Sequence, residues 1–461
     1  MPRAGQLKPP TDSRLSDHIS IGVLTRVFPP ELVDGVVAEA ERAERRHRLL
    51  PARVVVYYVL ALALFSDCSY EEVMRQLVEG LAWESGWRQS WEVPRKGSIF
   101  KARQRLGREP LELLFRAVAR PLAGVSTRGA FYRGLRLVSV DGTCLDVADT
   151  EENDEAFGRP GSSRREGGGA FPQLRLVALA ESGTHAIFDA ALGRYTDSEQ
   201  ALADRLWDSL AEGMLCLADR GFYSFERFQK ARAMGAQLLW RVQSSVGLPR
   251  EQALHDGSYL THISKDNHGR ARRRGPQARV VEYRLDDPAL ADDDQRYRLL
   301  TTILDPSAAP ASELAALYPQ RWELESALDE LKTHQRGPRV VLRSKHPDGV
   351  YQEAYGHLCT HYAIRRVMHD AALTADLIPQ RLSFIRGLRA ARRTARTQPG
   401  FSPPTASPLP IDIRSPRSSP NPCPSAAGAP TRASSSARCP TGASNAPSTA
   451  TGHNRSSQSR T

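Results

Sequence analysis

The chain has 461 residues, of which 40% are hydrophobic, so most of it should be globular and it can form two or three domains. Its formal net charge of +11 favours polyanionic partners, among which nucleic acid is the commonest. The six cysteines are scattered, which argues against a zinc centre, and the N-terminal sequence does not resemble a signal peptide. The longest apolar run, residues 54–65, is too short for a membrane span, which needs about 20 residues. We therefore expect a cytoplasmic protein with reduced thiols and no membrane partner.

The first part of the chain has the hydrophobic spacing of helices. Residues 1–15 carry no such pattern and are predicted to be disordered, whereas residues 16–125 are predicted to form a helical N-terminal domain that binds DNA. One helix should start within residues 28–31 and continue through the charged run 39–46, and the apolar run 54–65 should be a buried helix.

A basic segment, residues 94–106, is predicted to be a turn that leads into a helix. Its Lys101 and Arg105 are candidate contacts to DNA phosphates, together with Ser98 and Arg103. The alternative interpretation is a solvated basic helix without a ligand.

Beyond residue 130 the pattern changes to that of strands. Two short apolar strands, residues 135–140 and 214–218, each end in an acid, Asp141 and Asp219. The other elements expected here are strands at 173–180, 185–190 and 236–242, a helix at 198–210, and a helix that Ser224 caps and that runs to Ala233.

Three further segments follow different patterns. Residues 152–169, rich in Gly, Arg and Ser, are expected to be a loop, and residues 245–310 are expected to be rich in strands. Residues 397–461 consist mainly of Ser, Pro, Ala, Thr and Arg, which cannot form a core, so this tail is predicted to be disordered. One hypothesis for its composition is a gene that is read out of frame near its end.

The segment 318–332 is predicted to be a helix with a functional face. At about 100° per residue, Tyr318, Arg321, Glu325 and Lys332 fall within roughly 60° of one another. A carboxylate between two cations suits a site that holds a metal and binds phosphates beside it. The alternative is a solvated face with an Arg321–Glu325 pair at i, i+4.

Asp141, Asp219 and Glu325 together suggest a cluster of carboxylates. Acids at the ends of strands are accessible and rigidly placed, which suits catalysis. Three converging carboxylates repel one another unless cations neutralise them. Oxygen ligands favour Mg²⁺ or Mn²⁺, and two such ions would support phosphodiester chemistry. Each Asp alone could also belong to an ordinary turn.

With these acids placed, the chain resembles the DDE transposases of bacterial insertion sequences, in the branch named after insertion sequence four. The third acid of that family lies in the motif Tyr-x2-Arg-x3-Glu-x6-Lys, which Tyr318, Arg321, Glu325 and Lys332 match. The strand-Asp-Gly-Thr and Asp-Arg-Gly-Phe blocks match residues 140–143 and 219–222. Gly193 and residues 342–344 also fit.

The resemblance implies an α/β fold with a ribonuclease-H-like core and a β-rich insertion, preceded by an all-α N-terminal domain. The core would comprise residues 130–244 and 311–396, and the insertion residues 245–310. The implied function is cut-and-paste DNA transposition, in which an Mg²⁺-dependent enzyme hydrolyses DNA at the transposon ends and joins the 3′-hydroxyl to target DNA. The partners would be DNA and, when two transposon ends are paired, a second copy of the chain. The protein would lie in the bacterial cytoplasm, associated with the nucleoid.

Residue roles follow by position in the motif. Asp141, Asp219 and Glu325 would be catalytic metal ligands, Arg321 and Lys332 would hold phosphates, and Tyr318 would donate a hydrogen bond to one. Relatives cut the second strand through a hairpin with a flipped base on an aromatic ring, for which Trp240 is the candidate; a buried strand aromatic is the alternative.

The tail departs from the family, whose members continue in ordered helices that pair two transposases, so assembly and activity are in question for this copy. The alternatives are therefore an inactive, transposase-derived DNA-binding protein and a metal-dependent nuclease that cuts without joining.

Overall fold

The computed structural model describes residues 22–46, 48–84, 93–160, 171–265, 275–284, 296–337 and 341–397. The disorder predicted for residues 1–15 and for the tail after Thr397 lies outside these ranges. Within them, no helix is both long enough and apolar enough to cross a membrane.

The N-terminal region is helical, as predicted, and its described residues form six helices. They are α1 (Val23–Val27), α2 (Pro30–Glu39), α3 (Ala52–Leu64), α4 (Tyr70–Glu84), α5 (Lys96–Leu106) and α6 (Glu109–Val118). Helix α3 is buried on all sides, because nearly every one of its side chains is apolar. The Ser69 hydroxyl accepts a hydrogen bond from the Glu72 N–H and so caps α4.

The predicted continuation of α2 through the charged run 39–46 is wrong. The helix ends at Glu39, and Glu41 takes a positive φ of 57°. The charged side chains after Glu39 are mostly exposed, so no buried apolar face extends the helix.

The sheet begins with a three-stranded antiparallel meander and then continues with two parallel strands. The meander is β2 (Leu135–Asp146), β3 (Gln173–Glu181) and β4 (Ala186–Arg194), and the parallel strands are β5 (Met214–Ala218) and β6 (Gln237–Arg241). Their spatial order is β4-β3-β2-β5-β6, with β5 beside β2, as in a ribonuclease-H-like core. The predicted fold class is confirmed.

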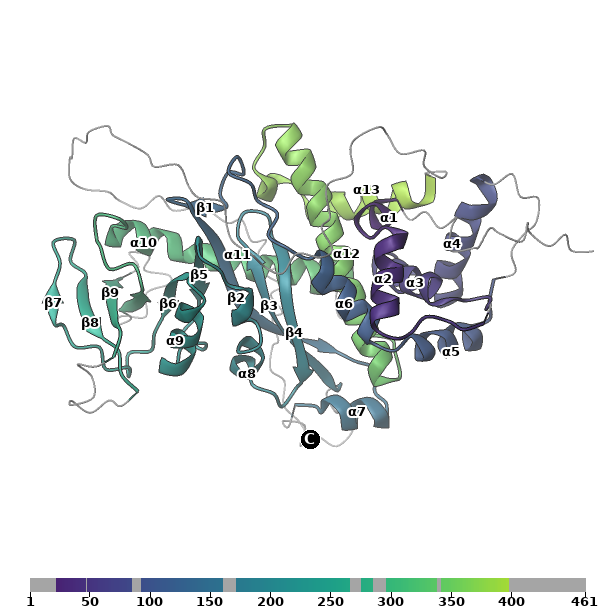
Figure 1. Ribbon diagram of the computed structural model, residues 1–461, viewed down its shortest axis with the longest axis horizontal. Coiled ribbons are helices and arrows are strands. Elements are labelled where there is room, and N and C mark those ends of the chain that lie inside the picture. Colours follow the sequence, from purple (N-terminus) through teal and green to yellow (C-terminus); the bar gives the residue numbers. More distant parts are fainter. Residues whose placement is uncertain are drawn as a thin grey trace, which may run out of the picture. The chain divides into compact units, whose positions relative to one another are not determined.

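Strands of the predicted insertion extend the same sheet past β6. They are β10 (Tyr297–Thr301), β9 (Gln277–Tyr283), β8 (Tyr259–His262) and β7 (Gln252–Ala253), and β1 (Phe131–Tyr132) pairs with β2. Figure 1 shows β9, β8 and β7 on the side of β6 that faces away from β2.

Helices cover both faces of the sheet. One face packs against α8 (Glu199–Ala203), the 3-10 turn η2 (Trp207–Ser209) and α9 (Phe225–Ala233), and the other against α10 (Ala311–Leu317). The helix expected over 198–210 is thus two short pieces. Part of the loop expected over 152–169 is helix α7 (Glu151–Phe157), which Thr150 caps.

The long helix α12 (Pro347–Thr374) joins the N-terminal helices to the sheet. It contacts α3 and α6 on one side and β4 on the other, as Figure 1 shows. Gly356 lets α12 approach α3 closely, because a Cβ there would lie 3.0 Å from Val59 Cγ1. The 3-10 turn η6 (Pro379–Arg381) and helix α13 (Phe384–Thr397) follow.

Candidate active site

Two of the predicted acids lie on neighbouring parallel strands. Val140 of β2 pairs with Ala218 of β5, so Asp141 and Asp219 occupy the next positions on adjacent strands. Neighbouring strands run about 4.8 Å apart, which brings the two backbones together. The sequence suggested that strand β2 ends at Asp141, but the strand continues to Asp146.

The third acid comes from a helical segment whose pitch changes twice. Residues Tyr318–Arg321 form the 3-10 turn η4, Trp322–Asp329 form α11, and Glu330–Gln335 form the π-helical turn η5. The four motif residues are therefore not on one face of a uniform α-helix. Tyr318, Arg321 and Lys332 nevertheless contact residues of the core strands or directly after them, and Glu325 is bound by Arg321.

Arg321 connects the strand acid to the helix acid. Its Nη1 lies 3.4 Å from Asp141 Oδ2, and its Nη2 donates to Glu325 Oε1 at 2.9 Å. The Arg321 side chain is 10% exposed, whereas the Glu325 side chain is 52% exposed. Asp141 and Glu325 thus share one cation, as converging carboxylates require.

Tyr318 secures the second strand acid. Its hydroxyl lies 3.3 Å from both Asp219 Oδ1 and the Ala218 carbonyl oxygen. Arg241 Nη1 lies 3.9 Å from the same Asp219 oxygen. The hydroxyl predicted to contact a phosphate is therefore engaged by Asp219.

Lys332 is exposed at the other side of the site. Its Nζ donates to Thr143 Oγ1 at 3.4 Å, and Thr143 lies two residues after Asp141 on β2. An exposed ammonium held beside the acids by one weak hydrogen bond remains available to an anion.

Burial and the local charges set the ionisation of the site. Burial raises the pKa of Asp141 to about 6, although the Gly142 N–H and the Arg321 charge lower it. Burial by itself would lower the pKa of Arg321, but Tyr318 and the surrounding carboxylates raise it overall. Asp141 is therefore a carboxylate whose charge is stabilised by any added cation.

A fourth carboxylate, Glu199, was missed by the sequence reasoning. A Cβ on Gly142 would lie 3.0 Å from Glu199 Cδ, so the glycine of the Asp-Gly-Thr block leaves room for this side chain. Arg175 Nη1 donates to Glu199 Oε1 at 3.2 Å. The only sequence signal is that Glu199 follows Ser198, which caps α8.

The donor set suits a hard divalent ion, since Asp141, Asp219 and Glu325 offer only oxygen ligands. Within the described residues, no three His, Cys, Asp or Glu side chains lie close enough to form a metal site as they stand. The Arg321 guanidinium lies between two carboxylates, where a metal cation would also bind. The Glu325 side chain is exposed, so it can rotate toward such an ion. The donor set therefore fits a divalent metal ion in general.

Trp240 does not fit its predicted role. It is fully buried between Trp207 and Phe228, with ring centroids 5.4 Å away in both cases. A base has no access to a ring face in that position, so this prediction is corrected. Trp322, missed by the sequence reasoning, is 59% exposed and lies three residues before Glu325.

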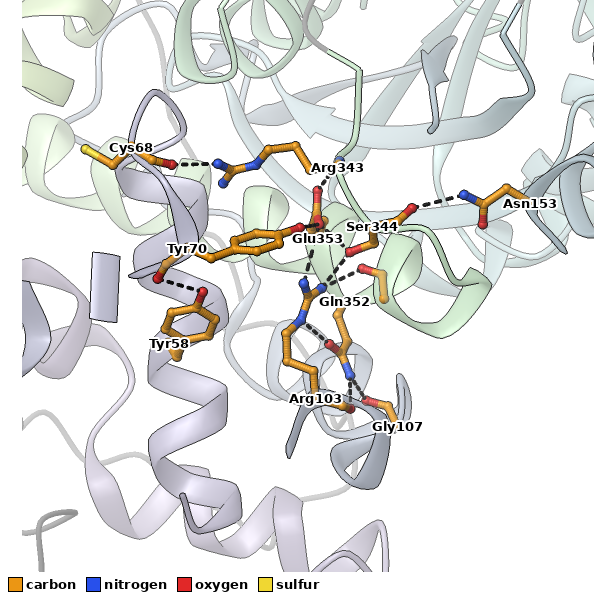
Figure 2. Close-up of polar contacts among 11 residues, drawn as sticks. Tyr58, Cys68, Tyr70, Arg103, Gly107, Asn153, Arg343, Ser344, Gln352 and Glu353 are labelled. Carbon is orange, nitrogen blue, oxygen red and sulfur yellow. Dashed lines mark hydrogen bonds and ion pairs between the residues drawn. The ribbon is translucent and has the colours of Figure 1, made fainter. Parts of the chain in front are cut away.

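The basic helix α5 is divided between surface and core. Lys101 and Arg105 are exposed, but Arg103 is buried. Figure 2 shows Arg103 among residues of α12 and the preceding loop, where it donates to Gln352 Oε1 and Ser344 Oγ, each at 2.9 Å. Arg103 therefore holds the N-terminal region to α12 and is not a phosphate contact.

Comparison with known proteins agrees with this geometry. Residues 132–362 match the family model "Transposase DDE domain", and residues 18–116 match "Insertion element 4 transposase N-terminal". The fold and the match define a DDE transposase, a class of nucleic-acid-cleaving enzymes that bind DNA and in general use divalent metal ions. The chain belongs to the insertion element 4 family of transposases.

Two relatives come from Escherichia coli (strain K12). "Transposase InsG for insertion sequence element IS4" is 28% identical over 377 residues, which cover 81% of this chain and 83% of the relative. "Putative transposase InsZ" is 27% identical over 251 residues, 54% of this chain and 81% of the relative. A solved piggyBac transposase synaptic complex with hairpin DNA is similar over 81% of this chain and 79% of its own, at 10% identity and a TM-score of 0.44.

Proposed function

We propose that the chain is a cut-and-paste transposase that cleaves DNA at the ends of its own element and joins the freed 3′-hydroxyl to target DNA. The supporting observation is the Arg321 guanidinium, which contacts Asp141 and Glu325 while Asp219 adjoins Asp141 on the next strand. A protein that only bound DNA would have no need to hold two carboxylates on one buried cation with a third carboxylate beside the neighbouring strand.

In this proposal Asp141, Asp219 and Glu325 are the metal ligands. Two Mg²⁺ or Mn²⁺ ions held there would activate a water or a 3′-hydroxyl and neutralise charge at the scissile phosphate. Arg321, released from the carboxylates, would turn to a phosphate oxygen, and Lys332 would bind a second one. Tyr318 would keep Asp219 in place from the 3-10 turn.

Base handling belongs to Trp322 in this proposal. Its ring is exposed beside Glu325, so a base flipped near the cleaved strand could stack on it. Lys101 and Arg105 of α5 would contribute phosphate contacts from the N-terminal region.

The experiment uses DNA from both flanks of the gene, which should carry the inverted repeats. Replacing Asp219 with Ala should abolish Mg²⁺-dependent cleavage of these ends and leave their binding nearly unchanged. Asp370→Ala removes an exposed carboxylate from α12 and serves as the matched control. Cleavage by the Asp219→Ala protein would refute the assignment.

The wild-type products distinguish the alternatives. Strand transfer to a plasmid supports the transposase, cleaved ends that never join indicate a nuclease, and binding without cleavage indicates an inactive DNA-binding relative. We further propose that two copies of the chain assemble on paired ends. Light scattering with and without end DNA should then show the mass of a dimer only when DNA is bound.

A further inference from the structure

The exposed arginine face of α13 is not used by the site described above. Helix α13 contains five arginines and no acid. Its apolar side, with Phe384, Leu388 and Ala391, is buried. Arg386, Arg389 and Arg393 are exposed and lie within about 60° of one another at helical spacing. The helix therefore presents a strip of positive charge that its own sequence does not neutralise.

The arginines of α13 differ in their surroundings. Arg392, which points elsewhere, donates to the Leu64 carbonyl oxygen at 2.7 Å and fixes α13 to the end of α3. Arg386 and Arg389 form no ion pair with any of the described residues. Exposed guanidinium groups without an acidic partner favour a polyanion.

The strip adjoins the catalytic helix through a groove of about 690 Å³. One wall contains Trp322 and Glu325, and the other contains Phe384 and Ile385 at the start of α13. Both Trp322 and Ile385 are partly exposed, at 59% and 36%. The lining also includes Asp329, Glu330 and His334, and the groove ends at the start of α13, one residue before Arg386.

We propose that DNA leaves the active site along this groove, with bases against Trp322 and Ile385 and phosphates on Arg386, Arg389 and Arg393. The occupant is DNA and not an acidic protein, because the groove continues directly from Glu325, where the proposed function places the scissile strand. The three arginines span about 10 Å of helix axis, close to three nucleotides of one B-form strand at about 3.4 Å each. This inference rests on the proposed function.

The test measures binding without metal, so it does not depend on cleavage. A fluorescein-labelled 40-base-pair duplex of mixed sequence is titrated in EDTA at several salt concentrations. The double variant Arg386→Glu/Arg389→Glu should weaken binding by at least tenfold. The slope of log K against log[salt] should fall by about 2, since each phosphate contact contributes about 0.9.

Two matched variants make the result specific. Arg284→Glu/Arg296→Glu makes the same change in net charge at exposed residues beside β9 and β10, and it should weaken binding far less. Arg386→Lys/Arg389→Lys keeps the charge and should retain most of the affinity. Equal losses in the two Glu pairs, or no loss in the α13 pair, would overturn the proposal.

A cross-link tests the path itself. Benzoylphenylalanine at position 385 should cross-link to the duplex on irradiation, whereas the same group at position 284 should not. No cross-link at position 385 with a well-folded protein that still binds the duplex would contradict the path and leave the catalytic proposal intact. If the protein cross-links to DNA through position 385 but does not cleave it, only the catalytic assignment is contradicted.

Discussion

Arg321 holds together acids that come from distant parts of the chain. Its guanidinium lies between Asp141 of β2 and Glu325 of α11, where divalent ions would otherwise be needed. Without metal, the Arg321 guanidinium neutralises the charges of Asp141 and Glu325. In the proposed metal-bound site, the metal ions would neutralise these carboxylates instead.

Arg321→Ala should destabilise the metal-free protein by about 1–3 kcal/mol, because two carboxylates lose their shared partner. Adding Mn²⁺ should restore more stability to the variant than to the wild type, because the ions take the place of the missing charge. Thermal unfolding in EDTA and in Mn²⁺ measures both effects. Equal metal-induced increases in Tm would show that Arg321 and the ions do not occupy the same place.

The two tryptophans should respond in opposite ways to truncation. Trp240→Ala removes a fully buried indole and should cost about 3–5 kcal/mol of stability. Trp322→Ala removes an exposed ring, so stability should change by less than about 0.5 kcal/mol, while base stacking worth about 1–3 kcal/mol is lost. Chemical denaturation and hairpin formation on end DNA separate the two. A destabilised Trp322→Ala protein would contradict this assignment.

At the scale of elements, the helical segment that carries Glu325 is anchored by Glu330. This buried carboxylate begins η5 and lies 3.1 Å from His185 Nδ1 and 3.2 Å from His361 Nε2. Arg365 Nε of α12 donates to it at 2.8 Å. The β3–β4 turn and α12 thus hold the segment at Glu330, five residues after Glu325.

Glu330→Gln should destabilise the protein by about 3–5 kcal/mol, since it leaves the buried Arg365 without its countercharge. The substitution should reduce cleavage only by displacing Glu325. Because low temperature favours the folded segment, cleavage should be partly recovered there. Denaturation and cleavage at two temperatures measure this. Unchanged stability would mean that the cluster does not fix the segment.

The same cluster predicts a pH dependence. Burial by itself would raise the pKa of Glu330, but His185, His361 and Arg365 lower it well below its usual range. A lowered carboxyl pKa stabilises the fold above the unfolded value of about 4.3, and this contribution is lost as the pH falls below it. The wild type should therefore lose more stability than Glu330→Gln as the pH falls from about 5 to about 3. Parallel pH profiles of Tm would contradict this.

At the scale of the whole molecule, the N-terminal helices and the catalytic region share one core. A single hydrophobic cluster includes residues of α3, α12 and β4, among them Val59, Leu358 and Ile187. The network in Figure 2 adds polar contacts at the same junction, where Tyr70 and Arg103 of the N-terminal region meet Glu353 of α12. The two regions should therefore not unfold independently.

Arg103→Met tests this coupling. It leaves the buried Glu353 without its cation and should cost about 3–5 kcal/mol. Amide protection of α3 and α12 should fall together in hydrogen exchange, because both elements depend on the shared core. Lys101→Met, two residues away at the surface, is the control and should change neither. Loss of protection in α3 alone would show that the regions are independent.

Local sequence pattern is enough to predict several elements and residues of this chain. The strands that lead to Asp141 and Asp219, the buried helix α3 and the cap at Ser224 all follow from side chains close together in the chain, as does the spacing of the Tyr-Arg-Glu-Lys motif. Tertiary structure alone decided which of several similar residues are buried. It placed Trp240 and Arg103 in the core, left Trp322 and Lys101 exposed, and assembled the partners of Glu330. The physical reason is that burial is created by elements far apart in sequence, so a residue's immediate neighbours do not reveal it.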